Sequence, residues 1–409
     1  VINDIKKGLV ADLSVYKDDA TYKKYNETLM SNLNYYGFQA GLPSYTIPGG
    51  IWVNKALAED NNINVPKPDW SIDEYTRFVS KADGKTFWGS KGTPVDIVNL
   101  GTTTINKMIK EENKIDLNSD EVKSLLKYFP KWAEKSIDVA AGAGKITKDI
   151  VKECSAYSWY YFTNNRSLVN FEDPWFLTAG ADESAKESDA YIKAADWDFY
   201  PFPSTKYADN SVKIVMDPIC IHNYAADDKN NEWSKEEIQK RDVAYTFTSF
   251  WTASTVAKKA VYAQKFSENG QMKLAAGDSF PVVTGEGYDE QMKLWNGLEA
   301  HKVYKDKPGF QEVLKIWKEG KNTLVDYTDA CEKCWTKSVT ENGEKKDTLY
   351  EWMHNGDETV AGCWPGDKGW ADNVKSRLPD WNDTINKRIG TAQKQLKDAL
   401  KTYYGIDAK

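Results

Sequence analysis

Apolar residues recur at helical spacing in several stretches of the chain, and each stretch has a start or stop signal. The tetrapeptides beginning at Ser71 and Ser234, Ser-Ile-Asp-Glu and Ser-Lys-Glu-Glu, are capping boxes and predict a helix over 71–81 and another from Ser234 onward. Ser119 opens a helix predicted over 122–133, and 381–404 keeps helical spacing until Gly405. Short strand-like runs lie between the helices, at 50–53, 199–202, 213–216, 219–222 and 279–283. This alternation predicts an α/β chain.

The length of 409 residues fits two or three domains at about 100–200 residues each. No repeat and no low-complexity linker separates them. We therefore expect the chain to pass between its domains more than once.

Composition adds a surplus of amphipathic aromatic residues. The chain has 16 Trp and 23 Tyr against 14 Phe. Trp and Tyr suit surfaces that are flat, apolar on the face and hydrogen-bonding at the edge. The surplus suggests that the protein binds a flat-faced, hydroxylated molecule such as a sugar.

Charge and hydropathy exclude several classes of function. The formal net charge is −7 and the chain has five Arg, so a phosphate-binding surface for nucleic acid is not expected. No apolar run approaches the roughly 20 residues of a membrane-spanning helix. The first residues lack the basic start and apolar stretch of a signal peptide, which fits a mature, trimmed or cytoplasmic chain.

The cysteines give a weak metal signal. Their odd number, five, argues against a disulfide framework. Cys331, Cys334, His354 and Cys363 could supply four zinc ligands, but their spacing fits no common zinc finger. A local disulfide and unreactive thiols are the alternatives, and we favour the thiols.

Several motifs occur in an order that resembles a known family. They are GLPSYTIPGGIWVNK at 41–55, INVPKPDW at 63–70, NRSLVNFEDPW at 165–175, WDFYPFP at 197–203, VMDPICI at 215–221 and SFPV at 279–282. The series is similar to the family 1 extracellular solute-binding proteins of bacterial ABC importers, the maltose-binding-protein-like group. The match covers most of residues 5 to 300.

The resemblance implies a two-lobed, type II periplasmic-binding-protein-like α/β fold, with central sheets flanked by helices and a hinge of crossing strands. On this interpretation 1–46 and 216–283 form one lobe, and 47–215 and 284–409 form the other. The family's usual opening strand, helix and strand have no counterpart here. We therefore expect the first lobe to lack its usual N-terminal start or to be built differently.

The resemblance also implies a function. It is the capture of an oligosaccharide in the cleft between the lobes, by aromatic stacking and hydroxyl hydrogen bonds, for delivery to the membrane permease. The expected protein is a monomer without cofactor, metal or nucleic-acid partner. It is expected to be extracellular, either lipid-anchored at the cell surface or periplasmic. The ligand residues implied are Tyr45, Thr46, Asp173, Trp175, Asp217, Trp251 and Phe280.

Most of these residues also have a purely structural interpretation. Trp175 matches a family tryptophan that stacks on a sugar ring, but it could be a core residue at a strand end. Tyr45 and Thr46 lie on the crossing loop, where a turn packed on the hinge is the alternative. Asp217 could accept sugar hydroxyls, cap a helix or form a salt bridge. Trp251 and Phe280 are weaker candidates, and a core role is the default for Trp251.

Departures from the family pattern leave the ligand open. Many sugar-binding relatives carry an acid where Ile47 stands and a tyrosine where Val53 stands. Four later tryptophans, at 335, 352, 364 and 370, either extend an aromatic platform or form a local apolar cluster.

A glycoside hydrolase or lyase is the rival from another class. It needs a pair of carboxylates, for which Glu172 with Asp173, or Asp326 with Asp329, are available. Such pairs arise by chance in a chain with 61 acidic residues, and no catalytic motif accompanies them. We therefore expect no enzymatic activity.

Overall fold

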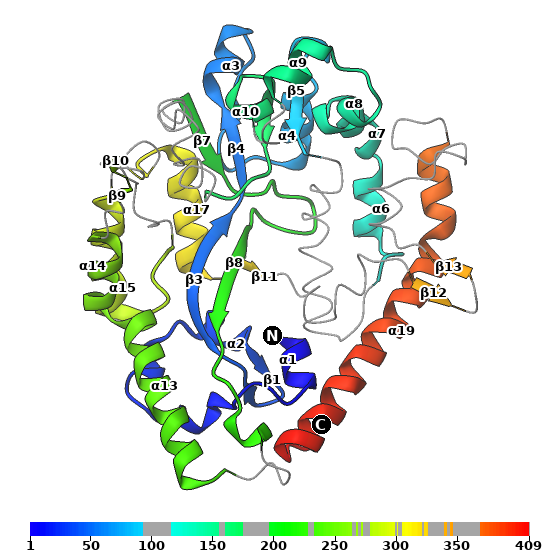
Figure 1. The fold of residues 1–409 in the computed structure, drawn as a ribbon. Helices are drawn as coiled ribbons and strands as arrows, with labels where there is room; N and C mark the ends of the chain where they lie inside the picture. Colours follow the sequence, from blue (N-terminus) through cyan, green and yellow to red (C-terminus); the bar gives the residue numbers. More distant parts are fainter. Residues whose placement is uncertain are drawn as a thin grey trace.

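Two α/β regions are joined by a pair of long strands in the computed structural model (Figure 1). The structure describes residues 1–92, 116–154, 160–174, 196–227, 233–263, 267–268, 271–272, 279–298, 301, 305–320, 323–325, 339–341, 344–346 and 369–408. None of the helices described combines the length and the apolar character needed to cross a membrane.

The strands that join the two regions are β3 (Leu42–Gly49) and β8 (Val212–Ile219), which pair antiparallel. A short strand, β11 (Thr323–Val325), adds to β8 in parallel and completes a three-stranded sheet. The sequence predicted two strands, 213–216 and 219–222, where β8 is continuous. Pro218 does not break it because Pro218 lies opposite Pro43, so the two positions have no N–H groups to exchange.

A four-stranded sheet forms the core of the upper region in Figure 1. Its order is β5 (Trp88–Lys91), β6 (Ser167–Asn170), β4 (Ile51–Asn54) and β7 (Trp197–Tyr200). β5 and β6 are parallel, whereas β4 is antiparallel to both β6 and β7. The C-terminal ends of β5, β6 and β7 therefore meet at the edge where β3 continues into β4.

Most helices begin where their capping signals predict. Both capping boxes form, at the start of α4 (Ile72–Val79) and of α13 (Lys235–Ala253). The helix predicted over 122–133 is instead two helices, α6 (Asp120–Leu126) and α7 (Phe129–Glu134). Pro130 explains the break, because it has no N–H to donate to the carbonyl four residues earlier.

The last helix, α19 (Trp370–Tyr404), begins earlier than predicted and ends at Gly405 in the left-handed conformation, as predicted. Pro379 lies inside this helix. Fully buried side chains hold the helix in place on both sides of the proline: Trp370 and Leu378 before it, and Ile385 after it. The N-terminal part of α19 packs in the core of the four-stranded sheet, and its end packs on α1 (Ile2–Lys6). Figure 1 shows α19 along one side of the molecule, reaching both regions. The division into one lobe of 1–46 and 216–283 and another of 47–215 and 284–409 stays a prediction.

The remaining elements are short or cover the flanks. They are η1 (Leu13–Tyr16), η2 (Tyr22–Lys24), α2 (Glu27–Ser31), β1 (Asn34–Tyr35), β2 (Phe38–Gln39), α3 (Lys55–Asp60), α8 (Ile137–Gly142), α9 (Lys148–Glu153), α10 (Tyr160–Thr163), η4 (Tyr224–Asp227), α14 (Thr255–Ala263), β9 (Ser267–Glu268), β10 (Gln271–Met272), α15 (Gly285–Asn296), α17 (Pro308–Glu319), β12 (Val339–Glu341) and β13 (Glu344–Lys346). The segment predicted as a strand at 279–283 forms only an isolated bridge, between Val283 and Tyr25.

Many tryptophans fill the core rather than a surface. The largest fully buried side chains include Trp52, Trp70, Trp88, Trp132, Trp197, Trp295 and Trp370. Two of them donate hydrogen bonds inside the fold: the indole N–H of Trp70 donates to the carbonyl of Pro201 at 2.9 Å, and that of Trp132 to Thr76 at 3.0 Å. The tryptophan surplus is thus explained in large part by packing.

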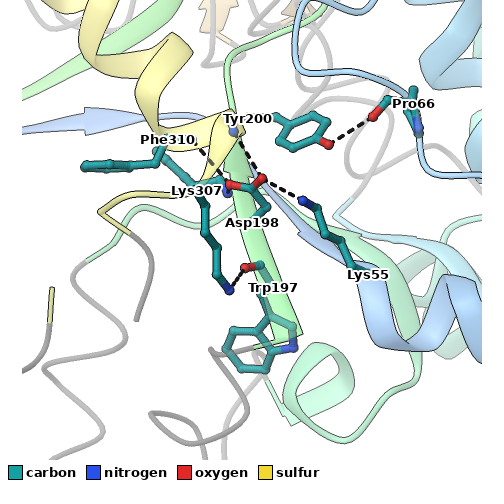
Figure 2. Close-up of polar contacts among 9 residues, drawn as sticks. Lys55, Pro66, Trp197, Asp198, Tyr200, Lys307 and Phe310 are labelled. Atoms are coloured by element: carbon teal, nitrogen blue, oxygen red, sulfur yellow. Dashed lines mark hydrogen bonds and ion pairs between the residues drawn. The ribbon is translucent and has the colours of Figure 1, made fainter. Parts of the chain in front are cut away.

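A buried carboxylate fastens α17 to the edge strand β7 (Figure 2). Asp198 accepts hydrogen bonds from the backbone N–H groups of Gly309 at 3.0 Å and Phe310 at 3.3 Å, in the first turn of α17. Lys55, at the start of α3, forms an ion pair with it at 2.9 Å. The Lys307 ammonium donates to the carbonyl of Trp197. This network holds α17 over β7, an edge strand of the four-stranded sheet.

Candidate functional site

Tyr45 and Asp217 lie side by side on the crossing strands. They are register partners in the β3–β8 ladder, so both side chains leave the same face of the pair. The ladder is irregular between Pro43 and Tyr45, which turns the β3 side chains locally. Tyr45 is half-buried and Asp217 is exposed. The structure therefore brings these two predicted ligand residues together on an accessible face.

Thr46 links the paired strands β3 and β8 to the segment at 279–280. Its backbone N–H donates to Oγ of Ser279 at 3.2 Å, and its carbonyl accepts from the N–H of Phe280 at 2.7 Å. The residue is fully buried, and its Oγ1 has no hydrogen-bond partner among the described residues. Thr46 thus lies at the crossing as expected, with its hydroxyl turned into the protein.

Phe280 and Trp251 lie in different surroundings. The ring of Phe280 is 1% exposed and packs edge-on against Trp295 and Trp317 in the core. Trp251 lies near the end of α13, 39% exposed, with its ring stacked on that of Phe247 at 6.5 Å between centroids. The structure does not group either ring with Tyr45 and Asp217, and the core role favoured for Trp251 does not fit its exposure.

Asp173 packs directly against the crossing strands. It belongs to the loop that follows β6, and Gly49 and Lys213 are the last register pair of the β3–β8 ladder. A Cβ placed on Gly49 would lie 2.5 Å from Oδ1 of Asp173 and 3.0 Å from Cβ of Lys213. Only glycine at position 49 leaves room for this carboxyl group, so the backbone itself forms one wall of its site.

Two further charged residues complete the surroundings of Asp173. Glu172 forms an ion pair with Lys91 at 3.4 Å, and the two side chains are only 18% and 12% exposed. Lys91 is the last residue of β5. We call Lys91, Glu172, Asp173 and Lys213 the charged edge. Sequence reasoning did not select the two lysines, because only strand register shows that they approach the same loop.

Burial makes the carboxyl group of Asp173 a weaker acid. It raises the pKa of Asp173 to about 6. Lys213 acts in the opposite direction and lowers the pKa, whereas the negative charge of Glu172 raises it further. Perturbed carboxyl groups of this kind cluster at functional sites.

Asn170 is a second polar group that sequence reasoning did not select. It ends β6, is fully buried and is the register partner of both Lys91 and Trp52. Neither amide atom, Nδ2 nor Oδ1, has a hydrogen-bond partner among the described residues. Leaving such a group unpaired costs about 1–3 kcal/mol, so this end of β6 is a place where a ligand or a water molecule would be stabilised.

Several predicted residues lie outside the described ranges. They are Trp175, the possible metal ligands Cys331, Cys334, His354 and Cys363, the later tryptophans 335, 352 and 364, and the acids Asp326 and Asp329. Trp370 is fully buried in the core of the four-stranded sheet, which fits the local-cluster interpretation for this one tryptophan. Among the described residues, no group of three or more His, Cys, Asp or Glu side chains could hold a metal ion.

A comparison with protein-family models finds no match, and a comparison with curated proteins finds none either. Solved structures do match over nearly the whole chain. A sugar transporter from Rhizobium etli in an open conformation has a TM-score of 0.53 at 13% identity, over 96% of this chain and 82% of that chain. A solute-binding protein of an ABC transporter from Thermotoga lettingae is bound with α-D-tagatose. Its TM-score is 0.52 at 14% identity, over 96% of this chain and 82% of that chain.

A third match is an ABC substrate-binding protein from Listeria monocytogenes in complex with cycloalternan. Its TM-score is 0.51 at 12% identity, over 98% of this chain and 82% of that chain. Identities this low establish the architecture alone. The predicted fold class is confirmed: the chain has the two-lobed α/β fold of ABC-transporter solute-binding proteins.

Proposed function

We propose that this protein is the extracellular substrate-binding component of an ABC importer, which captures an oligosaccharide between its lobes. The observation that supports the proposal is the fold, shared over nearly the whole chain with proteins described as a sugar transporter and as complexes with α-D-tagatose and cycloalternan. The crossing strands β3 and β8 provide the connection about which such lobes close.

The charge of the site favours an uncharged ligand. The charged edge carries two lysines and two acids, so it offers hydrogen-bond donors and acceptors with little net charge. Sugar hydroxyls can donate to the carboxylates of Asp173 and Asp217 and accept from a lysine. The ring of Tyr45, next to Asp217 on the crossing strands, supplies an aromatic surface for a sugar face. We place the ligand against this surface, with Trp175 as the main stacking residue.

The partners follow from the same proposal. Closure of the lobes around the sugar would present a closed form to a membrane permease, which takes up the ligand. We propose that the protein acts as a monomer without a cofactor, at the cell surface through a lipid anchor or in the periplasm. The permease would distinguish the closed form of the protein from the open form.

Catalysis is the alternative, and two observations support binding over it. Glu172 forms an ion pair with Lys91, and the solved structures named above are described as a sugar transporter and as substrate-binding proteins. Incubating the pure protein with its oligosaccharide ligand should leave the ligand intact by chromatography. Product formation at a rate above that of an Asp173→Asn variant would replace the binding proposal with an enzymatic one.

Replacing Trp175 with alanine should weaken oligosaccharide binding by about 2 kcal/mol, roughly 30-fold in Kd, because the stacking surface is removed. The measurement is calorimetric titration with xylo-, manno-, gluco- and galacto-tetraoses. Phe247→Ala is the matched control: its ring is 66% exposed on α13 and its loss should leave Kd within about twofold. Unchanged binding by the Trp175 variant would remove this residue from the site.

A further inference from the structure

Asp173 is an acidic residue packed against the crossing strands. Its carboxyl group lies against the backbone of β3 at Gly49, beside Lys213 of β8, at the point where the crossing strands enter the four-stranded sheet. In the proposed function the ligand lies between the lobes, next to these strands, where this carboxyl group would contact it. The carboxyl group also adjoins the strands whose bending would accompany closure.

The charged groups around Asp173 come from three directions. β8 contributes Lys213, the loop itself contributes Glu172, and β5 contributes Lys91, which is paired with Glu172. β3 contributes Gly49 and therefore no charge. Burial raises the pKa of Asp173 to about 6, so near neutral pH a modest change in its surroundings alters its charge.

We propose that Asp173 makes ligand binding proton-linked: its ionised carboxylate accepts the ligand's hydroxyl groups, and binding releases to solvent the proton carried in the ligand-free protein. This inference rests on the proposed function. Hydroxyl groups donate to a carboxylate and stabilise its ionised form, so the bound state holds the proton less firmly than the free state.

The sign of the pH dependence follows. Above a pKa of about 6 the free protein already has the ionised carboxylate, and affinity is at its full value. Below it a proton must leave before binding, and affinity falls by up to about tenfold for each pH unit. We expect the Kd for the tightest-binding tetraose to be about tenfold higher at pH 5 than at pH 7. Titration at pH 6 in two buffers of different ionisation enthalpy should show that about half a proton is released per ligand.

Variants of the neighbours distinguish this role from a structural one. Lys213→Met removes the charge that lowers the pKa of Asp173, so the midpoint of the affinity profile should move to higher pH. Glu172→Gln removes the charge that raises it, so the midpoint should move to lower pH. Asp173→Asn should give a flat profile and release no proton. Asp209→Asn, a change at an exposed acid before β8, should keep the profile of the unmodified protein.

Folding is checked separately. Because folding raises the pKa of Asp173, its ionised form is less favourable in the fold, and Asp173→Asn should unfold at pH 7 at the same temperature or higher. If a tetraose binds with equal Kd at pH 5 and pH 7, or if the Asp173 variant keeps the profile, the proton link is overturned and the binding function stands. If no tetraose binds, the proposed function fails and this inference fails with it.

Discussion

Replacing Asp198 with alanine is expected to destabilise the protein by about 3–5 kcal/mol, the usual effect of removing one partner from a buried ion pair. Asp198 is 0% exposed, and it accepts from two N–H groups in the first turn of α17 as well as from the ammonium of Lys55. Alanine would leave these N–H groups without their acceptor and remove a negative charge from a helix N-terminus. Chemical denaturation followed by circular dichroism measures the loss.

The matched control is Asp306→Ala. Asp306 also precedes α17 and pairs with Lys305, but its side chain is 78% exposed, so the expected loss is at most about 0.5 kcal/mol. If the two variants lost equal stability, or if Asp198→Ala lost less than about 1 kcal/mol, the network of Figure 2 would not fasten α17 to β7 as described.

A methyl group at position 50 should be nearly as disruptive. Gly50 joins β3 to β4, and a Cβ there would lie 2.5 Å from the carbonyl oxygen of Tyr200 and 2.9 Å from the ring of Phe199. A backbone oxygen cannot move aside without disturbing the β4–β7 ladder. We expect Gly50→Ala to destabilise the protein by about 2–3 kcal/mol in the same denaturation experiment.

The control for Gly50→Ala is Gly142→Ala. Gly142 ends α8, and a methyl group added there would meet no side chain of the described residues within 4 Å, so alanine should be neutral or slightly stabilising. A Gly50 variant as stable as the Gly142 variant would mean that β4 and β7 approach each other less closely at this point.

Local signals in the sequence predicted the elements well where one residue decides the outcome. Ser71 and Ser234 started their helices, and Gly405 ended α19. Prolines were harder to interpret because their effect depends on the surroundings. Pro130 splits a predicted helix, whereas Pro379 lies inside α19, which the buried residues around it hold in place.

The candidate site was predictable only in part. Tyr45 was predicted on the crossing loop and Asp217 between two strand-like runs, whereas both lie within the paired strands β3 and β8, opposite each other. Lys91 and Lys213 are far from Asp173 in the sequence, and only strand register brings them towards its loop. The core position of Phe280 depends on helices that follow it in the chain, which no local pattern around residue 280 indicates.

The central claim is that the protein binds an oligosaccharide without converting it. Calorimetric titration of the pure protein with the four tetraoses, followed by chromatography of the same samples, tests it most directly. We predict saturable binding of one ligand per chain at micromolar or better affinity, a change in tryptophan fluorescence, and recovery of the intact sugar. Absence of binding to every tetraose, or release of shorter sugars, would contradict the account.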